Sequence, residues 1–264
     1  MLRTYLSALL LLVACTPEGE LEVRIYGEAF IEEGIPASEF ADGWALQFDS
    51  FLVNLGNVIV GPSRMNGAGL DESPFHVYDL TRPSMGLGQQ VDEGPVNVGF
   101  YGSVFWIAPD AEPVASDVSE ADLARIRDGG LALYVAGSAS KAGVTKRFAW
   151  GFATKTSYGN CEVETEVTSA APASVEFTIH GDHLFYDDLF SETPSVRFDL
   201  IAQADVDGDG EITQAELLAV DLRPLTNYQV GSTGIVDLWH FIEYQTGTLG
   251  HVNGEGHCEN TAEP

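Results

Sequence analysis

Apolar and polar residues alternate along most of the first two thirds of the chain, and a period of two is the pattern of half-buried β-strands. The first such stretch places Leu21, Val23 and Ile25 on one face. Segments 131–137 and 146–153 flank the turn-forming residues SASKAG, so they should pair as a hairpin. The same alternation predicts further strands at residues 75–80, 96–101, 104–108 and 174–180.

A change of phase in this alternation predicts a β-bulge. Apolar residues occupy even positions in 44–48 and odd positions in 51–55. One extra residue near Asp49 and Ser50 would keep the same face of the strand inward. Many short strands separated by Gly, Pro and Asn predict that residues 21–190 form a β-sandwich domain of seven or more antiparallel strands.

Helical periodicity replaces the alternation after Pro194. Val196, Leu200 and Ala204 follow one another at four-residue spacing, which places them on one helix face. The helices predicted from this periodicity span residues 195–204, 214–221 and 236–245. We therefore expect residues 191–264 to form a helical C-terminal part that packs on the sandwich. One more short helix, at 119–128, is predicted by its capping residues.

The N-terminus has the pattern of an export signal. Arg3 precedes an apolar run from Tyr5 to Ala14, which is too short to span a bilayer as a mature helix. The chain has no other segment that is apolar enough to cross a membrane. The alternative to a lipoprotein signal, described next, is an ordinary secretory signal with a chance cysteine at its end.

The stretch Leu12–Cys15 resembles the lipobox of bacterial lipoproteins. The resemblance implies that residues 1–14 are a signal peptide that is removed, and that Cys15 carries the lipid. It also implies export to the cell envelope, with the protein anchored in the outer membrane on its periplasmic or surface face. Residues 15–20 would then be a polar tether between the lipid and the folded part.

Charge narrows the choice of partners. The chain has 12 basic and 40 acidic residues, for a net charge of −28. Affinity for nucleic acid comes from lysine and arginine that displace counterions from phosphates, so this composition excludes nucleic acid. Membrane attachment is expected only through the N-terminal lipid. The acidic surface raises the local concentration of cations, which makes a divalent metal ion the partner to look for.

Three cysteines remain to be assigned. If Cys15 carries lipid, Cys161 and Cys258 are the remaining pair, and export permits a disulfide between them. The alternative is a pair of thiolate metal ligands, although neither cysteine lies in a CxxC spacing.

Residues 205–216, DVDGDGEITQAE, place carboxylates at the alternate positions from which a tight turn can enclose calcium. Asp205, Asp207 and Asp209 take positions 1, 3 and 5 of twelve, and Gly210 takes position 6, where the backbone turns sharply. The predicted calcium (Ca²⁺) ligands are Asp205, Asp207, Asp209, the Glu211 carbonyl, Thr213 and Glu216.

This stretch resembles the EF-hand calcium loop, and the helices predicted on either side lie where that motif has them. Ile212 matches the apolar residue that joins a short strand to a partner hand in the family. The best candidate for that partner, 228–239, has no carboxylate at its first, third or fifth position. A metal-free alternative also exists, because Thr213 and Glu216 form a capping box.

A second group of potential ligands follows the last predicted strand. His180, Asp182 and His183 lie within four residues, and His251 or His257 from the tail could join them as a remote ligand. Imidazole with carboxylate suits zinc, copper or iron rather than calcium. The alternative is that these polar groups only cap a strand and a turn.

We therefore predict a calcium-binding exported lipoprotein in which calcium is structural, and which acts as a surface binding or structural protein. The sequence contains no GxSxG, HExxH, Walker or GxGxxG segment, so no catalytic residue is predicted. The alternative is a transition-metal-binding protein or metalloenzyme that uses His180, Asp182 and His183. A sandwich that binds a carbohydrate or a peptide is a third hypothesis, and the sequence does not identify the protein or glycan ligand.

Overall fold

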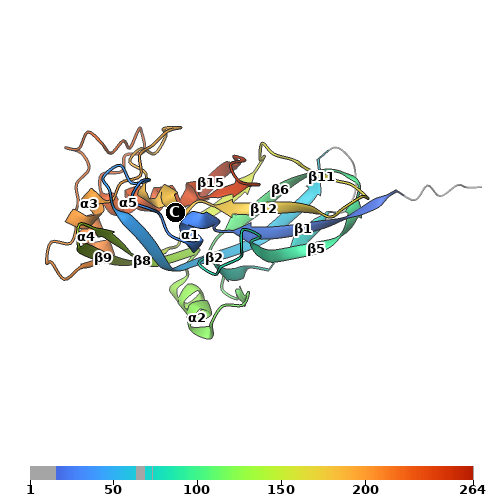
Figure 1. The fold of residues 1–264 in the computed structure, drawn as a ribbon, viewed down its shortest axis with the longest axis horizontal. Helices are drawn as coiled ribbons and strands as arrows, with labels where there is room; N and C mark the ends of the chain where they lie inside the picture. Colours follow the sequence, from blue (N-terminus) through green and yellow to red (C-terminus); the bar gives the residue numbers. More distant parts are fainter. Residues whose placement is uncertain (1–15, 64–68, 73, 264) are drawn as a thin grey trace, which may run out of the picture.

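The fold is mainly β and was obtained as a computed structural model that describes residues 16–63, 69–72 and 74–263. The predicted signal peptide and Cys15 lie outside the described residues. The strands form two sheets, both of which run along the long axis of the molecule (Figure 1). Within the described ranges, no helix is long and apolar enough to cross a membrane.

The smaller sheet has the order β14-β12-β1-β5. Its strands are β1 (Glu18–Tyr26), β5 (Gln89–Asn97), β12 (Ala173–Ile179) and β14 (Gly250–Val252). Strand β1 runs parallel to β12 and antiparallel to β5, while β14 runs antiparallel to β12. The predicted alternation is confirmed here, since Leu21, Val23 and Ile25 are fully buried.

The larger sheet follows the path β13-β9-β8-β2-β6-β10-β15. These strands are β2 (Ala45–Pro62), β6 (Gly99–Ile107), β8 (Leu133–Lys141), β9 (Val144–Phe152), β10 (Lys155–Gly159), β13 (Glu211–Ile212) and β15 (Glu259–Glu263). Four shorter strands pair beside this path, namely β3 (Leu70–Glu72), β4 (His76–Asp79), β7 (Val114–Ala115) and β11 (Thr165–Val167). The predicted bulge is confirmed, because the β2–β8 register shifts between Phe48 and Ser50.

Side chains from the two sheets meet in one hydrophobic core. Phe105 of the larger sheet stacks on Phe177 of the smaller sheet with ring centroids 4.2 Å apart. Phe105 also stacks on Tyr158 of the neighbouring strand β10, with ring centroids 4.7 Å apart. Aromatic pairs of this kind add to the free energy gained from burying their surface. The core therefore holds the two sheets against each other.

Five α-helices and two 3-10 helices are described. They are α1 (Glu28–Glu32), α2 (Glu120–Gly129), α3 (Asp199–Gln203), α4 (Gln214–Leu218), α5 (Leu238–Gln245), η1 (Gly181–Phe185) and η2 (Thr246–Thr248). The prediction of α2 is confirmed, with Ser119 as its N-cap. The predicted helix 195–204 is shorter than expected, because Val196 instead forms β-bridges with Phe40 and Tyr186.

Several pairings differ from the sequence prediction. The sheets are mixed rather than antiparallel, since β1–β12, β4–β7 and β9–β13 are parallel pairs. Segment 96–101 is divided between β5 and β6 instead of forming one strand. The β8–β9 hairpin turns tightly at Ala142 and Gly143, both with positive φ, so most of SASKAG belongs to the strands. The C-terminal part also supplies β13, β14 and β15, which were not predicted.

The predicted disulfide between Cys161 and Cys258 is confirmed. It joins the loop after β10 to the tail, and the His257 carbonyl accepts a hydrogen bond from the Glu162 amide at 2.9 Å beside it. Closing a loop of about 100 residues restricts the unfolded chain by about 3 to 5 kcal/mol in the chain-entropy description. The tail is thereby held against the edge of both sheets.

Candidate functional site

Residues 205–216, which we call the acidic loop, connect α3 to α4. The Asp205 carboxylate accepts hydrogen bonds from the amides of Gly208 at 2.7 Å and Gly210 at 3.0 Å. Gly210 has φ +88°, a conformation that side chains with a Cβ rarely adopt. The loop therefore folds back around its first carboxylate.

The structure brings three of the six predicted ligand residues together. One oxygen each from Asp205, Asp207 and Glu216 lies within 4.8 Å of the others. Asp209 instead accepts a hydrogen bond from the Glu211 amide at 2.7 Å. Glu216 also completes the capping box with Thr213, whose amide and hydroxyl donate to it at 2.9 and 2.8 Å.

Lys146 lies beside this group and was not predicted. Its ammonium forms an ion pair with Asp205, whose side chain is fully inaccessible to solvent. The hydrogen bond from Lys146, aided by those from Gly208 and Gly210, lowers the pKa of the Asp205 carboxyl. Lys146 and Arg147 stand together in a chain that has only 12 basic residues, and that adjacency was the available sequence signal.

The loop is attached to the edge of the larger sheet. Glu211 and Ile212 form β13, which pairs in parallel with Arg147 and Phe148 of β9. The Trp150 indole donates to the Ile212 carbonyl at 2.9 Å. These contacts hold the acidic loop at the edge of the larger sheet.

Segment 228–239 does not pair with the acidic loop. Gln229 instead forms a bridge with Asp188, and Asp237 forms one with Asp221. Asp237 also caps α5 and contacts the His240 ring at 2.8 Å. The segment considered as a partner hand therefore leads into α5 and caps it.

A second group, which we call the histidine cluster, comprises His180, His183, His251 and His257. His180 follows β12, His183 lies on η1 and His251 lies on β14, which pairs with β12. The ring centroid of His180 is 5.1 Å from that of His183 and 4.2 Å from that of His251, and the latter two are 5.4 Å apart. His257 stands 4.8 Å from His251. The strand pairing therefore joins the local pair to the tail, as the sequence suggested.

Two carboxyl groups face the cluster from different segments. Glu28, at the start of α1, places Oε2 3.3 Å from Nδ1 of His180, and burial raises the pKa of its carboxyl while His180 opposes the rise. Asp182 is 8% exposed, and burial raises the pKa of its carboxyl as well, against a hydrogen bond from the Tyr186 hydroxyl at 2.9 Å. Glu28 was missed by the sequence analysis because 152 residues separate it from His180.

Burial also keeps two of the imidazoles neutral. Desolvation, followed by repulsion from His180 and other rings of the cluster, lowers the pKa of His183 and of His251 to about 3. Nδ1 of His183 lies 3.0 Å from both the carbonyl and the hydroxyl of Thr248, which was not predicted as a partner. At neutral pH these rings therefore have lone pairs available for a ligand.

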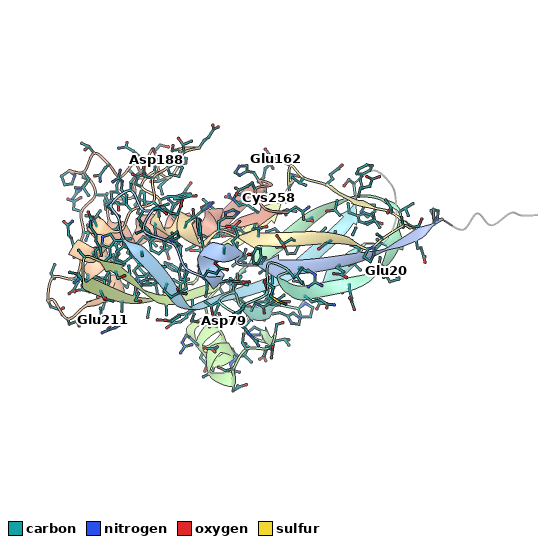
Figure 2. The ribbon with its side chains drawn as sticks, viewed as in Figure 1. Glu20, Asp79, Glu162, Asp188, Glu211 and Cys258 are labelled. Atoms are coloured by element: carbon teal, nitrogen blue, oxygen red, sulfur yellow. A yellow bond between two sulfur atoms is a disulfide. The ribbon has the colours of Figure 1, made fainter. Side chains whose placement is uncertain are left out.

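A cavity of about 230 Å³ opens on the histidine cluster. His183, His251 and His257 line it together with Cys258, whose position beside Glu162 is seen in Figure 2. A larger cleft of about 710 Å³ adjoins it, and Leu189, Thr248 and Asn260 line both. Phe190 and Tyr244 give the larger cleft an apolar wall.

Other acidic and histidine side chains make local contacts. Asp187 accepts from Arg197 at 2.5 Å, and Asp188 accepts from the amides of Phe190 and Ser191. His76 lies 3.3 Å from Glu72.

Comparison of the chain with family models, with curated proteins and with solved structures found no match.

Proposed function

We propose that the acidic loop binds calcium as a single EF-hand, and that the ion fixes α3 and α4 against a β-sandwich made by the two sheets. The observation that carries the proposal is the convergence of Asp205, Asp207 and Glu216 within 4.8 Å around a turn with Gly210 at its sharpest point. Carboxylates of this spacing supply the oxygen ligands that a hard cation prefers. Asp209, the Glu211 carbonyl and Thr213 complete the proposed ligand set.

A structural role fits the attachment of the loop better than a sensor role. Sensor EF-hands work as pairs that open a groove when calcium binds. Here β13 is paired with β9 of the sheet, and Ile212 is 2% exposed. An ion in this loop would stabilise an arrangement that already exists, and with calcium near the millimolar range outside cells a modest affinity would fill the site.

We further propose that the protein is an exported lipoprotein anchored through Cys15, and that it acts as a surface binding or structural protein rather than as an enzyme. Glu20 and Glu211 lie at opposite ends of the long axis (Figure 2). A lipid at the N-terminus would therefore present the acidic loop away from the membrane. The 710 Å³ cleft is the place for a protein or glycan ligand.

The calcium proposal is tested by calorimetric titration of the purified full chain. We expect one calcium ion to bind, and the midpoint of thermal unfolding to rise with calcium concentration, since a ligand that binds only the folded state stabilises it. Absence of calcium heat in the unaltered protein would contradict the proposal.

Glu216→Gln separates the two roles of this residue. Glutamine can keep the capping box with Thr213, but it removes the charge and one of the two oxygens that calcium would share. Calcium binding should therefore be lost while the metal-free protein stays as stable as before. The control is Asp110→Asn, which also replaces a carboxylate by an amide but lies outside the acidic loop. It should leave the calcium titration unchanged.

A further inference from the structure

The histidine cluster has donor atoms that the protein itself leaves without a partner. Among the described residues, Nδ1 of His251 and Oδ1 of Asp182 are buried and make no hydrogen bond. His251 is 5% exposed and Asp182 is 8% exposed. Buried polar atoms are nearly always hydrogen-bonded, so two such atoms beside one group of imidazoles call for a ligand.

Two of the rings are oriented by acceptors on their Nδ1 side. Glu28 lies against Nδ1 of His180, and the Thr248 carbonyl and hydroxyl lie against Nδ1 of His183. When Nδ1 of His183 carries the proton, its Nε2 has the free lone pair. Nε2 of His180 lies 3.4 Å from the Gly254 carbonyl, a long contact that a metal ion would replace. A carboxylate or carbonyl behind the imidazole is the arrangement that fixes the tautomer and ring position of metal-bound histidines.

The ligand atoms are close enough for one ion. Atoms of His180, Asp182 and His183 lie within 4.8 Å of one another, and so do those of His180, His251 and Glu255. The first set contains Asp182, whose Oδ1 is buried and has no hydrogen-bond partner, so it is the set that a single ion fits best. Ligands at about 2.0 to 2.1 Å from a tetrahedral ion are about 3.3 Å apart, which small side-chain rotations can reach from the observed spacing.

The chemistry of the donors selects the class of ion. Imidazole nitrogen suits copper and zinc and is a poor ligand for calcium. Cys258 lines the same cavity but is held in the disulfide, so it offers no thiolate. The donor set is therefore nitrogen with carboxylate oxygen.

We propose that His180, Asp182 and His183 bind one divalent transition-metal ion, Cu²⁺ or Zn²⁺, with Glu28 as a positioning residue for His180 and with one coordination position facing the 230 Å³ cavity. This site is distinct from the acidic loop in residues and in metal class, so it stands or falls independently of the calcium proposal. His183 and His251 line the cavity, which gives the ion access from solvent. The adjoining 710 Å³ cleft places an organic ligand next to the open position.

The test uses the purified full chain, freed of metal with a chelator and returned to buffer with excess calcium. Cu²⁺ is added during calorimetry, and its electron paramagnetic resonance spectrum is recorded at one equivalent. We expect one copper per chain, a spectrum split by imidazole nitrogens, and displacement of that signal when Zn²⁺ competes. No copper or zinc uptake would overturn the proposal.

Four variants assign the site. His183→Ala and Asp182→Asn should each weaken copper binding at least about 100-fold, and Glu28→Gln should weaken it about 10-fold, as loss of an orienting partner does elsewhere. His76→Ala, outside the cluster, should leave it unchanged. Near-ultraviolet circular dichroism shows which variants are folded, and Glu28→Gln gives a reading even if an alanine variant does not fold. Copper binding that persists unchanged in folded His183→Ala or Asp182→Asn would overturn the assignment.

Discussion

The acidic loop and the histidine cluster are built in opposite ways from the same chain. The loop draws its carboxylates from twelve consecutive residues, and each acidic residue is exposed or half-exposed. The cluster draws its rings from β12, η1, β14 and the tail, and three of its four members line or adjoin a cavity. A site made of neighbouring residues can form with its turn alone, whereas the cluster requires the strand pairing of β12 with β14.

The two regions also differ in how their ionisable side chains are stabilised. The acidic loop balances Asp205 with the ammonium of Lys146 and Glu211 with Arg147. The histidine cluster uses burial, which keeps His183 and His251 neutral. We therefore expect the affinity of the acidic loop for cations to fall as the salt concentration rises, because salt screens exposed charges. Metal binding at the histidine cluster should instead depend on the lone pairs of the neutral imidazole nitrogens. The following changes are ordered from the largest expected effect.

Removal of the disulfide should have the largest effect, and it should act on the histidine cluster and not on the acidic loop. In the double variant Cys161→Ser, Cys258→Ser, the free energy of unfolding should fall by about 3 to 5 kcal/mol, because the unfolded chain regains the entropy of the open loop. Urea unfolding measures this. At temperatures where the variant is folded, copper affinity should fall about 10-fold as the tail loosens beside the histidine cluster, while calcium affinity stays constant. An equal loss of both metals would contradict the proposed independence.

Trp150→Phe should weaken the attachment of the acidic loop. The change removes the indole that donates to the Ile212 carbonyl and leaves that buried carbonyl without its partner, which costs about 1 to 3 kcal/mol of unfolding free energy. Calcium affinity should fall with it, because β13 is held less firmly. Trp106→Phe is the control, since this half-exposed ring contacts Lys155 on the outer face. A calcium titration identical to that of the unaltered protein would show that sheet attachment is irrelevant to the loop.

Gly210→Ala should affect calcium binding through the backbone. A Cβ at this position would meet only the Thr145 carbonyl at 3.8 Å, so the cost arises from φ +88° and is about 1 to 2 kcal/mol. Calcium affinity should fall about 10-fold while copper binding is unchanged. Gly43→Ala is matched in strain, with φ +80° and open space around its Cβ, but it lies outside the loop. It should lose stability without losing calcium.

Lys146→Met should strengthen calcium binding, and this is the smallest of the expected changes. The ammonium pairs with Asp205, a proposed calcium ligand, so its removal should raise calcium affinity by up to about fivefold. The gain should shrink at high salt. Arg147→Met is the comparison, because Arg147 pairs with the Glu211 carboxylate rather than with a proposed ligand oxygen. Weaker calcium binding in Lys146→Met would mean that the lysine supports the loop.

The elements that sequence predicted correctly depend on local patterns. The bulge between Phe48 and Ser50 follows from alternation, and α2 follows from Ser119 and the glycines at its end. The disulfide followed from counting cysteines. The start of α3 could not be predicted this way, since Asp42, more than 150 residues earlier, accepts hydrogen bonds from the amides of Phe198 and Asp199 at 2.7 Å each.

Long-range pairing limited the prediction of the fold and the histidine cluster alike. The parallel alignment of β1 with β12 joins Leu21 to Ala173, and no local pattern specifies that register. His180 and His183 were recognisable as a pair because they are close in sequence. Glu28 and Thr248, which lie behind these rings, are ordinary polar residues until the fold is known.

The pairing of β13 with β9 also bears on solubility. An unpaired strand edge offers its backbone amides and carbonyls to other chains, and natural proteins protect such edges. Strand β9 borders the larger sheet, and only a two-residue strand of the acidic loop lies along it. If the acidic loop unfolds when the proposed calcium ion is removed, the edge of β9 next to exposed Val144 is uncovered. Removal of the cation would then cause the molecules to aggregate through their exposed sheet edges before the hydrophobic core unfolds.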